Sequence, residues 1–121
     1  MEMDLRIKVR DSNGTPVIEL GGELDAYTCS RFREAVIEVI QNGHTNIIIN
    51  MEDVEYIDSS GLGTLVGGLK RVSEQKGTIA IICASTQIKK VFEITGLERV
   101  FPIYHNEEDA VSEISHKAIS P

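Results

Sequence analysis

Three polar residues, Asp58, Ser59 and Ser60, stand immediately before Gly61 and an amphipathic segment. A side-chain oxygen at such a position caps a helix by accepting a hydrogen bond from a free backbone N–H. One residue is enough for a cap, and here three stand in line. A helix start also stabilises negative charge, so a phosphoserine at this place is compatible with folding. The stretch therefore predicts either a plain helix cap or a modifiable switch at the start of a helix.

A catalytic serine is a weaker interpretation of the same residues. The stretch lacks the G-x-S-x-G turn that exposes a serine nucleophile in hydrolases. The three histidines, His44, His105 and His116, fall in predicted loop or terminal positions and show no metal-ligand spacing. The sequence therefore predicts no catalytic residue and no metal site, and we do not expect an enzyme.

The glycines that follow Ser60 resemble phosphate-binding loops but miss a defining residue. Positions 61–66 begin G-x-G-x-x-G, but Val66 stands in place of the third glycine. The spacing from Gly63 to Gly68 is that of a Walker loop, yet Leu69 follows where lysine is required. A dedicated nucleotide loop is therefore not favoured, and no cofactor is expected. The alternative is that helical glycines allow close approach to a neighbouring element: Gly63, Gly67 and Gly68.

Composition and charge exclude several classes of protein. The chain has 121 residues, a length that predicts one domain over 1–121. A formal charge of −7 leaves no basic surface to neutralise phosphates, which argues against a nucleic-acid partner. The sequence contains no apolar run of membrane-spanning length and begins without a signal peptide, so we expect a cytoplasmic protein. Cys29 and Cys83 fall in different predicted elements, and no disulfide is expected.

The elements that must position the polar stretch begin with a predicted hairpin. Residues 5–9 alternate between apolar and polar, as a half-buried strand does, and Asn13-Gly14 predicts a tight turn. The return strand is expected over 15–20, with Pro16 suggesting an edge position and Gly21-Gly22 ending the strand.

Helices and buried strands alternate through the rest of the chain. The spacing predicts helices over about 28–41, from the polar stretch to about Lys76, around 88–95 up to Gly96, and from 106 onward. Strands are expected at 47–49, 78–83 and 100–103. This order predicts an α/β fold: a mixed, mostly parallel sheet of four or five strands packed with about four helices.

Three segments resemble the bacterial anti-sigma factor antagonists, whose fold is the STAS (sulfate transporter and anti-sigma factor antagonist) domain. They are GGELDAYT at 21–28, NIIINMEDVEYIDSSGLGTL at 46–65 and VFEITGLERVF at 91–101. The resemblance implies partner switching. The unphosphorylated antagonist binds an anti-sigma factor that is also a serine kinase, and the sigma factor is released. Phosphorylation ends the binding, and a serine phosphatase of the PPM type resets the antagonist.

The resemblance also implies roles for individual residues. Ser59 matches the first serine of the family motif and is the expected phosphate acceptor, whereas Ser60 is expected to serve the helix cap. Asp25 is expected on a loop beside the phosphorylation site and in the kinase contact. Independently of the resemblance, loops after parallel strands lie along one edge of a sheet, so we expect the Asp25 loop at the edge that holds Ser59, with Tyr27 and Leu62 as apolar anchors. The expected partner-binding set is Asp25, Tyr27, Asp58, Ser60, Gly61 and Leu62.

Other interpretations stay open at this stage. Asp25 could merely precede a helix as a cap, and Leu62 could belong wholly to the core. STAS domains also serve as accessory subunits of lipid-transport or stressosome complexes, and a nucleotide-binding STAS domain is a further alternative. The sequence leaves the sigma factor, the kinase, the stimulus and the oligomeric state open.

Overall fold

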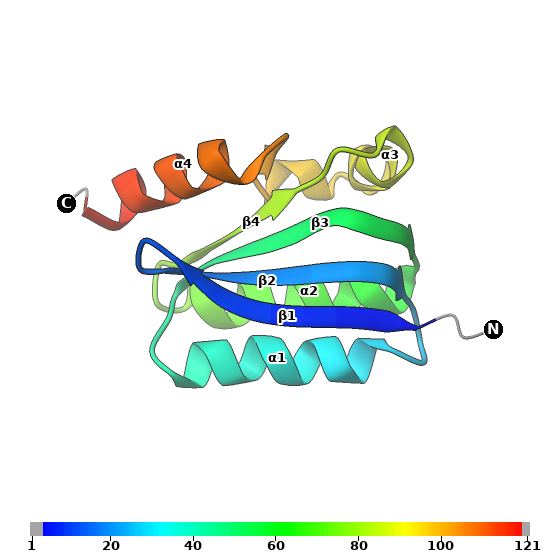
Figure 1. Ribbon diagram of the computed structural model, residues 1–121, viewed down its shortest axis with the longest axis horizontal. Coiled ribbons are helices and arrows are strands. Elements are labelled where there is room, and N and C mark those ends of the chain that lie inside the picture. The colour runs from blue at the N-terminus through cyan, green and yellow to red at the C-terminus, as the bar shows by residue number, and fades with distance from the viewer. Residues whose placement is uncertain (1–3, 120–121) are drawn as a thin grey trace.

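The strands lie side by side in the order in which they occur in the chain. The computed structural model describes residues 4–119, with side chains through Ile114 (Figure 1). The sheet has five strands in the order β1-β2-β3-β4-β5. Strands β1 and β2 pair antiparallel, and each later pair is parallel, which confirms the mixed, mostly parallel sheet. The strands are β1 (Leu5–Ser12), β2 (Thr15–Leu24), β3 (Asn46–Ile57), β4 (Thr78–Ile82) and β5 (Ile103–Tyr104).

The hairpin forms where its sequence predicts, but β2 is not an edge strand. Asn13 and Gly14 adopt positive φ angles of 52° and 88°, and the Gly14 N–H donates to the Asp11 carboxylate at 3.0 Å. Strand β2 lies between β1 and β3, so the edge position inferred from Pro16 is wrong. Pro16 sits at the start of β2, one residue before the pairing with β3 begins at Val17, so no bond to β3 needs its missing N–H.

Strand β2 also continues through the two glycines that were expected to end it. Gly22 has a φ of 101°, and a Cβ at this position would lie 2.2 Å from the Asp4 carbonyl oxygen. The pairing with β3 shifts register at two places near these glycines, as β-bulges do. The glycines therefore bend the strand without ending it, and β2 reaches Leu24 beside the slightly longer β3.

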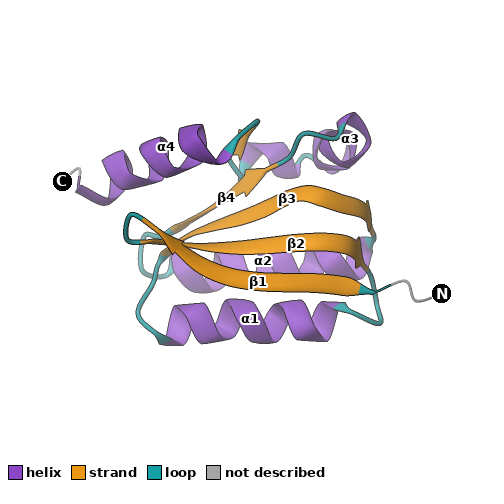
Figure 2. Ribbon diagram, viewed as in Figure 1, coloured by secondary structure: helices purple, strands orange, loops and turns teal. Residues whose placement is uncertain are grey.

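Helices α1 (Cys29–Gln41) and α2 (Ser59–Ser73) cover one face of the sheet (Figure 2). Their apolar sides join the inward side chains of the strands in the main core cluster. Helix α3 (Thr86–Thr95) adds Ile88 and Phe92 to the same cluster. Its members include Leu5, Ile18, Leu24, Phe32, Val36, Ile49, Met51, Ile57, Leu65, Ile79, Phe92 and Phe101.

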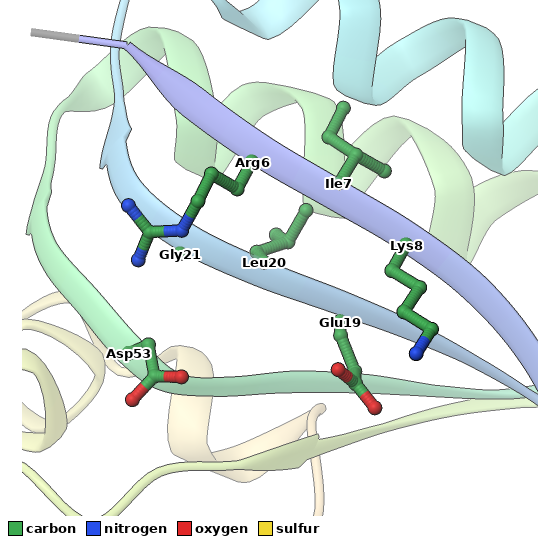
Figure 3. A pocket seen from close by; sticks show the side chains of 7 residues that line it. All are labelled: Arg6, Ile7, Lys8, Glu19, Leu20, Gly21 and Asp53. Carbon is green, nitrogen blue, oxygen red and sulfur yellow. The ribbon is translucent and has the colours of Figure 1, made fainter.

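Helix α4 (Glu107–Ile119) covers part of the opposite face, over a smaller cluster that includes Ile48 and Ile82. Arg10 of β1 forms ion pairs with Glu19 of β2 and with Glu107 in the first turn of α4. The rest of this face is polar. Figure 3 shows the side chains around a shallow hollow of about 230 Å³, among them Arg6, Lys8, Glu19 and Asp53.

The last strand lies later in the chain than its sequence predicts. Gly96 ends α3 in the left-handed conformation, with a φ of 77°, which confirms the predicted stop. A short 3₁₀ helix (Leu97–Arg99) follows, and the N–H groups of Val100 and Phe101 both donate to the Leu97 carbonyl. This extra turn uses the residues expected to begin the strand, so β5 starts only at Ile103.

Candidate functional site

The start of α2 is capped by Asp58. Its backbone is extended, and its carboxylate accepts hydrogen bonds from the N–H groups of Ser60 and Gly61 at 2.9 and 3.2 Å. These are two of the N–H groups that a helix leaves unpaired at its first turn. The expectation that Ser60 serves the cap is therefore wrong, because Ser60 contributes its N–H and Asp58 supplies the accepting oxygen. Ser60 itself is half-buried.

Ser59 is the first residue of α2, and its side chain is exposed. Within the described part of the chain neither the Ser59 nor the Ser60 hydroxyl has a hydrogen-bond partner, because the cap uses the Asp58 carboxylate and the backbone N–H of Ser60. The two serines differ in exposure: Ser59 is exposed and Ser60 is half-buried. The structure thus separates the three polar residues into a cap and a solvent-facing hydroxyl. The hydroxyl oxygen stands beside the positive end of the helix dipole, where added negative charge is tolerated.

Gly61 is buried and allows α2 to begin close to the sheet. A Cβ at Gly61 would lie 2.8 Å from Leu24 Cγ, 2.9 Å from Ile57 Cγ1 and 2.9 Å from the Leu24 carbonyl oxygen. A larger residue would push the helix start away from the ends of β2 and β3. Gly61 therefore positions the predicted site from within, and its part in partner binding stays a prediction. Leu62 is half-buried against the core, between the two predicted alternatives of anchor and core residue.

The loop that follows β2 lies beside the start of α2. Leu24 and Ile57 are partners at the carboxyl ends of the parallel strands β2 and β3. The Asp58 N–H donates to the Leu24 carbonyl oxygen at 3.2 Å, which joins the two loops directly. Asp25 follows Leu24 and Ser59 follows Asp58, so this hydrogen bond brings two residues that are far apart in the sequence close together. The carboxyl ends of parallel strands are where sites form in α/β sheets.

Asp25 fixes the shape of its own loop. Its carboxylate accepts from the N–H groups of Tyr27 and Thr28 at 2.9 and 3.1 Å. The Thr28 hydroxyl accepts from the Asp25 N–H at 3.0 Å and donates to the Glu23 carbonyl at 2.9 Å. This role of Thr28, which is 4% exposed, was missed in the sequence. The D-x-x-T spacing is the available signal, since residues three apart exchange such bonds at helix starts.

Tyr27 projects from this braced loop and is 93% exposed. The phenol ring therefore presents almost its whole surface to solvent beside the carboxyl end of the sheet. A large exposed aromatic side chain on a rigid loop is a common anchor in protein interfaces. The geometry keeps Tyr27 available for the contact that the sequence predicts.

The helical glycines of α2 do not form a phosphate loop. Gly63, Gly67 and Gly68 lie inside the helix, so their backbone N–H groups are part of the helical ladder. Gly68 permits close packing as expected, because a Cβ there would lie 3.0 Å from Val36 Cγ1. The same expectation is wrong for Gly63 and Gly67, where a Cβ would meet nothing within 4 Å. Each of these two glycines costs about 1 kcal/mol relative to alanine, without an internal contact that offsets it.

The described residues contain no group of three or more His, Cys, Asp or Glu side chains that could hold a metal ion. Cys29 and Cys83 are both free thiols, and burial raises the pKa of Cys83. Neither His44 nor His105 hydrogen-bonds Ser59, and the side chain of His116 lies outside the described residues. Among the described helices, none combines the length and the apolar character needed to cross a membrane.

Comparison with known proteins places this fold and site in a family. Residues 6–110 match the STAS domain. The chain belongs to the STAS domain family. A relative named anti-sigma-B factor antagonist, from Staphylococcus aureus, is 35% identical over 106 residues, covering 88% of this chain and 98% of that protein. The anti-sigma F factor antagonist of Paenibacillus polymyxa is 30% identical over 113 residues, covering 93% and 97%.

Solved STAS-domain structures have the same fold as this chain. The crystal structure of an anti-sigma factor antagonist from Mycobacterium paratuberculosis superposes with a TM-score of 0.87 at 23% identity, covering 95% of this chain and 97% of that one. The Bacillus cell fate determinant SpoIIAA, solved in its phosphorylated form, gives 0.71 at 28% identity, covering 90% and 99%. The expected STAS fold is therefore confirmed.

Proposed function

We propose that this STAS domain, acting as one module over residues 1–121, is an anti-sigma factor antagonist controlled by phosphorylation at Ser59. In its unphosphorylated form it binds an anti-sigma factor that is also a serine kinase, and a sigma factor is released. Phosphorylation of Ser59 ends that binding, and a PPM-type phosphatase restores it. The expected compartment is the cytoplasm, where bacterial transcription takes place.

The single observation that carries the proposal is the exposure of Ser59 at the capped start of α2, where the next serine, Ser60, is half-buried. A kinase must reach the serine oxygen in line with the γ-phosphate, so a hydroxyl held in a cap would be a poor acceptor. Asp58 caps the helix, so the Ser59 hydroxyl is not needed for the cap. The names of the relatives, and the solved phosphorylated form of one structural neighbour, support the same assignment.

The reaction transfers one phosphoryl group. Ser59 Oγ attacks the γ-phosphorus of ATP, an oxygen–phosphorus bond forms, and the bond to the departing ADP breaks. The hydroxyl proton passes to a base supplied by the kinase. Dephosphorylation is a separate hydrolysis: at the phosphatase a water molecule attacks the phosphorus, the bond to Ser59 Oγ breaks, the serine oxygen takes up a proton, and inorganic phosphate leaves.

The added phosphate changes the charge of the surface more than the fold. A phosphoserine carries about −1.5 to −2 charges at neutral pH. At Ser59 that charge stands at the positive end of α2, and it also stands beside Asp58 and near the Asp25 loop. Helix and phosphate attract each other, while a partner group selected for the neutral serine loses its contact. Release without unfolding is the expected result.

Phosphopeptide mapping tests the proposal directly. The chain is incubated with ATP and each purified serine-kinase anti-sigma factor of its source organism, and the modified residue is identified by mass spectrometry. We expect phosphate on Ser59, persistence of transfer in Ser60→Ala and loss in Ser59→Ala. Transfer that persists in Ser59→Ala but is lost in Ser60→Ala would reverse the assignment. Absence of both binding and transfer with every such kinase would overturn the proposed function.

A further inference from the structure

A groove of about 130 Å³ runs between α1 and α2 on the outer side of the helical layer. Helix α1 contributes an arginine and two apolar side chains to it, and α2 contributes bare backbone and a second arginine. The residues that define it include Arg33, Val36, Ile37, Gly63, Gly67 and Arg71. We refer to it below as the α1–α2 groove.

The groove leads away from the predicted phosphorylation site along one side of α2. Ser59, Gly63, Gly67 and Arg71 follow one another at intervals of four residues, and all four are exposed. Residues four apart are neighbours on a helix, at a rise of about 1.5 Å per residue, and each step of four turns by about 40° around the axis. The row from Ser59 to Arg71 therefore winds gradually around α2 over about 18 Å, and Ser59 lies one step before the first groove residue, Gly63.

Of the three glycines that line the groove, Gly63 and Gly67 have no role in the internal packing of the described chain. A Cβ at Gly63 or Gly67 would meet nothing within 4 Å, whereas Gly61 and Gly68 have close neighbours. Alanine would fit at both open positions and would favour the helix. What glycine provides there is exposed backbone, onto which a second helix can pack at a short interaxial distance.

The arginines give this strip a charge opposite to that of the molecule. The chain carries a formal charge of −7, yet Arg33 and Arg71 both line the groove and are exposed. Neither forms an ion pair with a side chain that the structure describes, whereas Arg10 and Arg31 do. Two guanidinium groups that form no ion pair within the described residues, placed beside this groove, select a partner with carboxylates.

We propose that the α1–α2 groove receives an α-helix of the anti-sigma factor, one that presents acidic side chains to Arg33 and Arg71 and small residues to the glycines. This inference rests on the proposed function, because the occupant is the same partner. It adds a physical reason for release. A phosphate on Ser59 stands at one end of the groove and repels the acidic helix that the arginines attract.

Substitution of the groove glycines gives an unusual pair of expected effects. Gly63→Ala and Gly67→Ala should each raise the melting temperature by roughly 3 °C, because helix propensity improves in open space. The same changes should weaken binding to the anti-sigma factor that binds the wild-type chain, and Gly67→Leu should weaken it about tenfold or more by calorimetry. Arg33→Glu and Arg71→Glu should weaken it by a similar factor at low salt, and less at high salt.

Matched variants separate a groove effect from a general surface effect. Ser112→Leu adds an exposed leucine to α4 on the opposite face, and Arg99→Glu reverses an exposed charge in the 3₁₀ helix. Both should bind within about twofold of the wild-type chain. If wild-type binding and Ser59 phosphorylation are observed but Gly67→Leu, Arg33→Glu and Arg71→Glu all bind like the wild type, the groove inference is overturned and the proposed function stands. If the wild-type chain binds no such anti-sigma factor, both are overturned.

Discussion

The face of the sheet under α1 and α2 buries apolar side chains along its whole length, whereas the face under α4 does so over one part only. Adjacent residues of β3 show the division: Ile49 points into the main cluster and Ile48 into the smaller cluster under α4. Beyond α4 the second face carries charged groups such as Arg6 and Asp53 (Figure 3).

The predicted switch belongs to the rim of the densely packed face. The Asp25 loop and the start of α2 are fixed to the main cluster through Leu24, Ile57 and the buried Gly61. The hollow on the polar face differs in that three of its charged lining residues, Arg6, Lys8 and Asp53, are exposed. A rigid platform is what a reversible charge switch needs, because the modification must change binding without melting its own surroundings.

The largest expected effect tests the difference between the faces with two neighbouring isoleucines. Ile49→Ala and Ile48→Ala remove the same atoms from side chains that are both 0% exposed. Losses for such changes span about 2–5 kcal/mol, according to how well the site can collapse. We expect Ile49→Ala in the upper half of that range, because the cluster around it is held on all sides, and Ile48→Ala in the lower half under a single helix.

Urea unfolding of both variants measures these losses of free energy. A larger loss for Ile48→Ala would contradict the view that the helical face carries most of the stability. An unchanged urea dependence of the unfolding free energy in both variants is the control that the compared states remain the same.

The second prediction compares carboxylates on the two regions. Asp25→Ala should weaken binding to the anti-sigma factor by about 2–5 kcal/mol if the partner pairs with this carboxylate in a desolvated contact. Asp25→Asn keeps an acceptor for the Tyr27 and Thr28 N–H groups but removes the charge. We expect the asparagine variant to retain the loop and to lose most of the affinity.

Asp53 on the polar face is the matched control for Asp25. It is exposed and lies outside both the switch and the groove, so Asp53→Ala should leave calorimetric affinity unchanged. Wild-type affinity in Asp25→Asn combined with weak binding in Asp25→Ala would show that binding depends on the conformation of the loop and not on the charge of Asp25.

Local chemistry predicted much of the fold. The Asn13-Gly14 turn, the stop at Gly96 and the helical periodicities depend on neighbouring residues, and each appears in the structure. The misplaced features depend on distant residues. At Gly22 the strand passes so close to the Asp4 backbone that a side chain would not fit, so the glycine serves the strand and does not end it. Pro16 is tolerated inside the sheet because β3 pairs with β2 only from the next residue.

The same division explains what the sequence disclosed about the site. The neighbourhood of Asp25 and Ser59 followed from the rule that parallel strands place their carboxyl ends on one edge. The choice of cap did not, because Asp58 and Ser60 are both good capping residues and the sequence ranks neither above the other. Packing of Gly61 against Leu24 fixes the helix start, and this long-range contact leaves Asp58 as the cap.

The third prediction concerns how α4 is held to the polar face. A hydrogen bond from the Arg10 guanidinium holds the pKa of the Glu107 carboxyl below its ordinary value of 4.5. The folded state therefore binds this proton more weakly than the unfolded chain does. The pair contributes stability above pH 4.5 that is lost as the pH falls through the lowered pKa of the folded state. Because both side chains are partly solvated, the contribution should be about 1 kcal/mol.

Urea unfolding from about pH 6 down to about pH 3 checks the sign. Glu107→Gln should be less stable than the wild type at the upper end, and the difference should vanish at the lower end. Glu108→Gln, at an exposed position in the same turn, should show no such difference. A gap between Glu107→Gln and wild type that persists in acid would mean that the glutamate acts through packing and not through its charge.

The smallest expected effect on stability is the one that matters most for the switch. Ser59→Asp adds a charge at the dense rim, where the dipole of α2 favours it by about 0.3–1 kcal/mol and nearby Asp58 opposes it. The two terms nearly cancel, so the free energy of unfolding should change by no more than about 0.5 kcal/mol. Affinity for the anti-sigma factor should nevertheless fall sharply, because the added charge faces the partner.

Ser60→Asp provides the contrast: its half-buried side chain would place a charge against the packed helix start, and we expect a larger loss of stability there. Calorimetric melting of both variants, and of the chain phosphorylated at Ser59, decides the matter. A marked fall in melting temperature on phosphorylation would show that the switch works by loosening the rim, and the contrast between a rigid platform and a changeable surface charge would have to be abandoned.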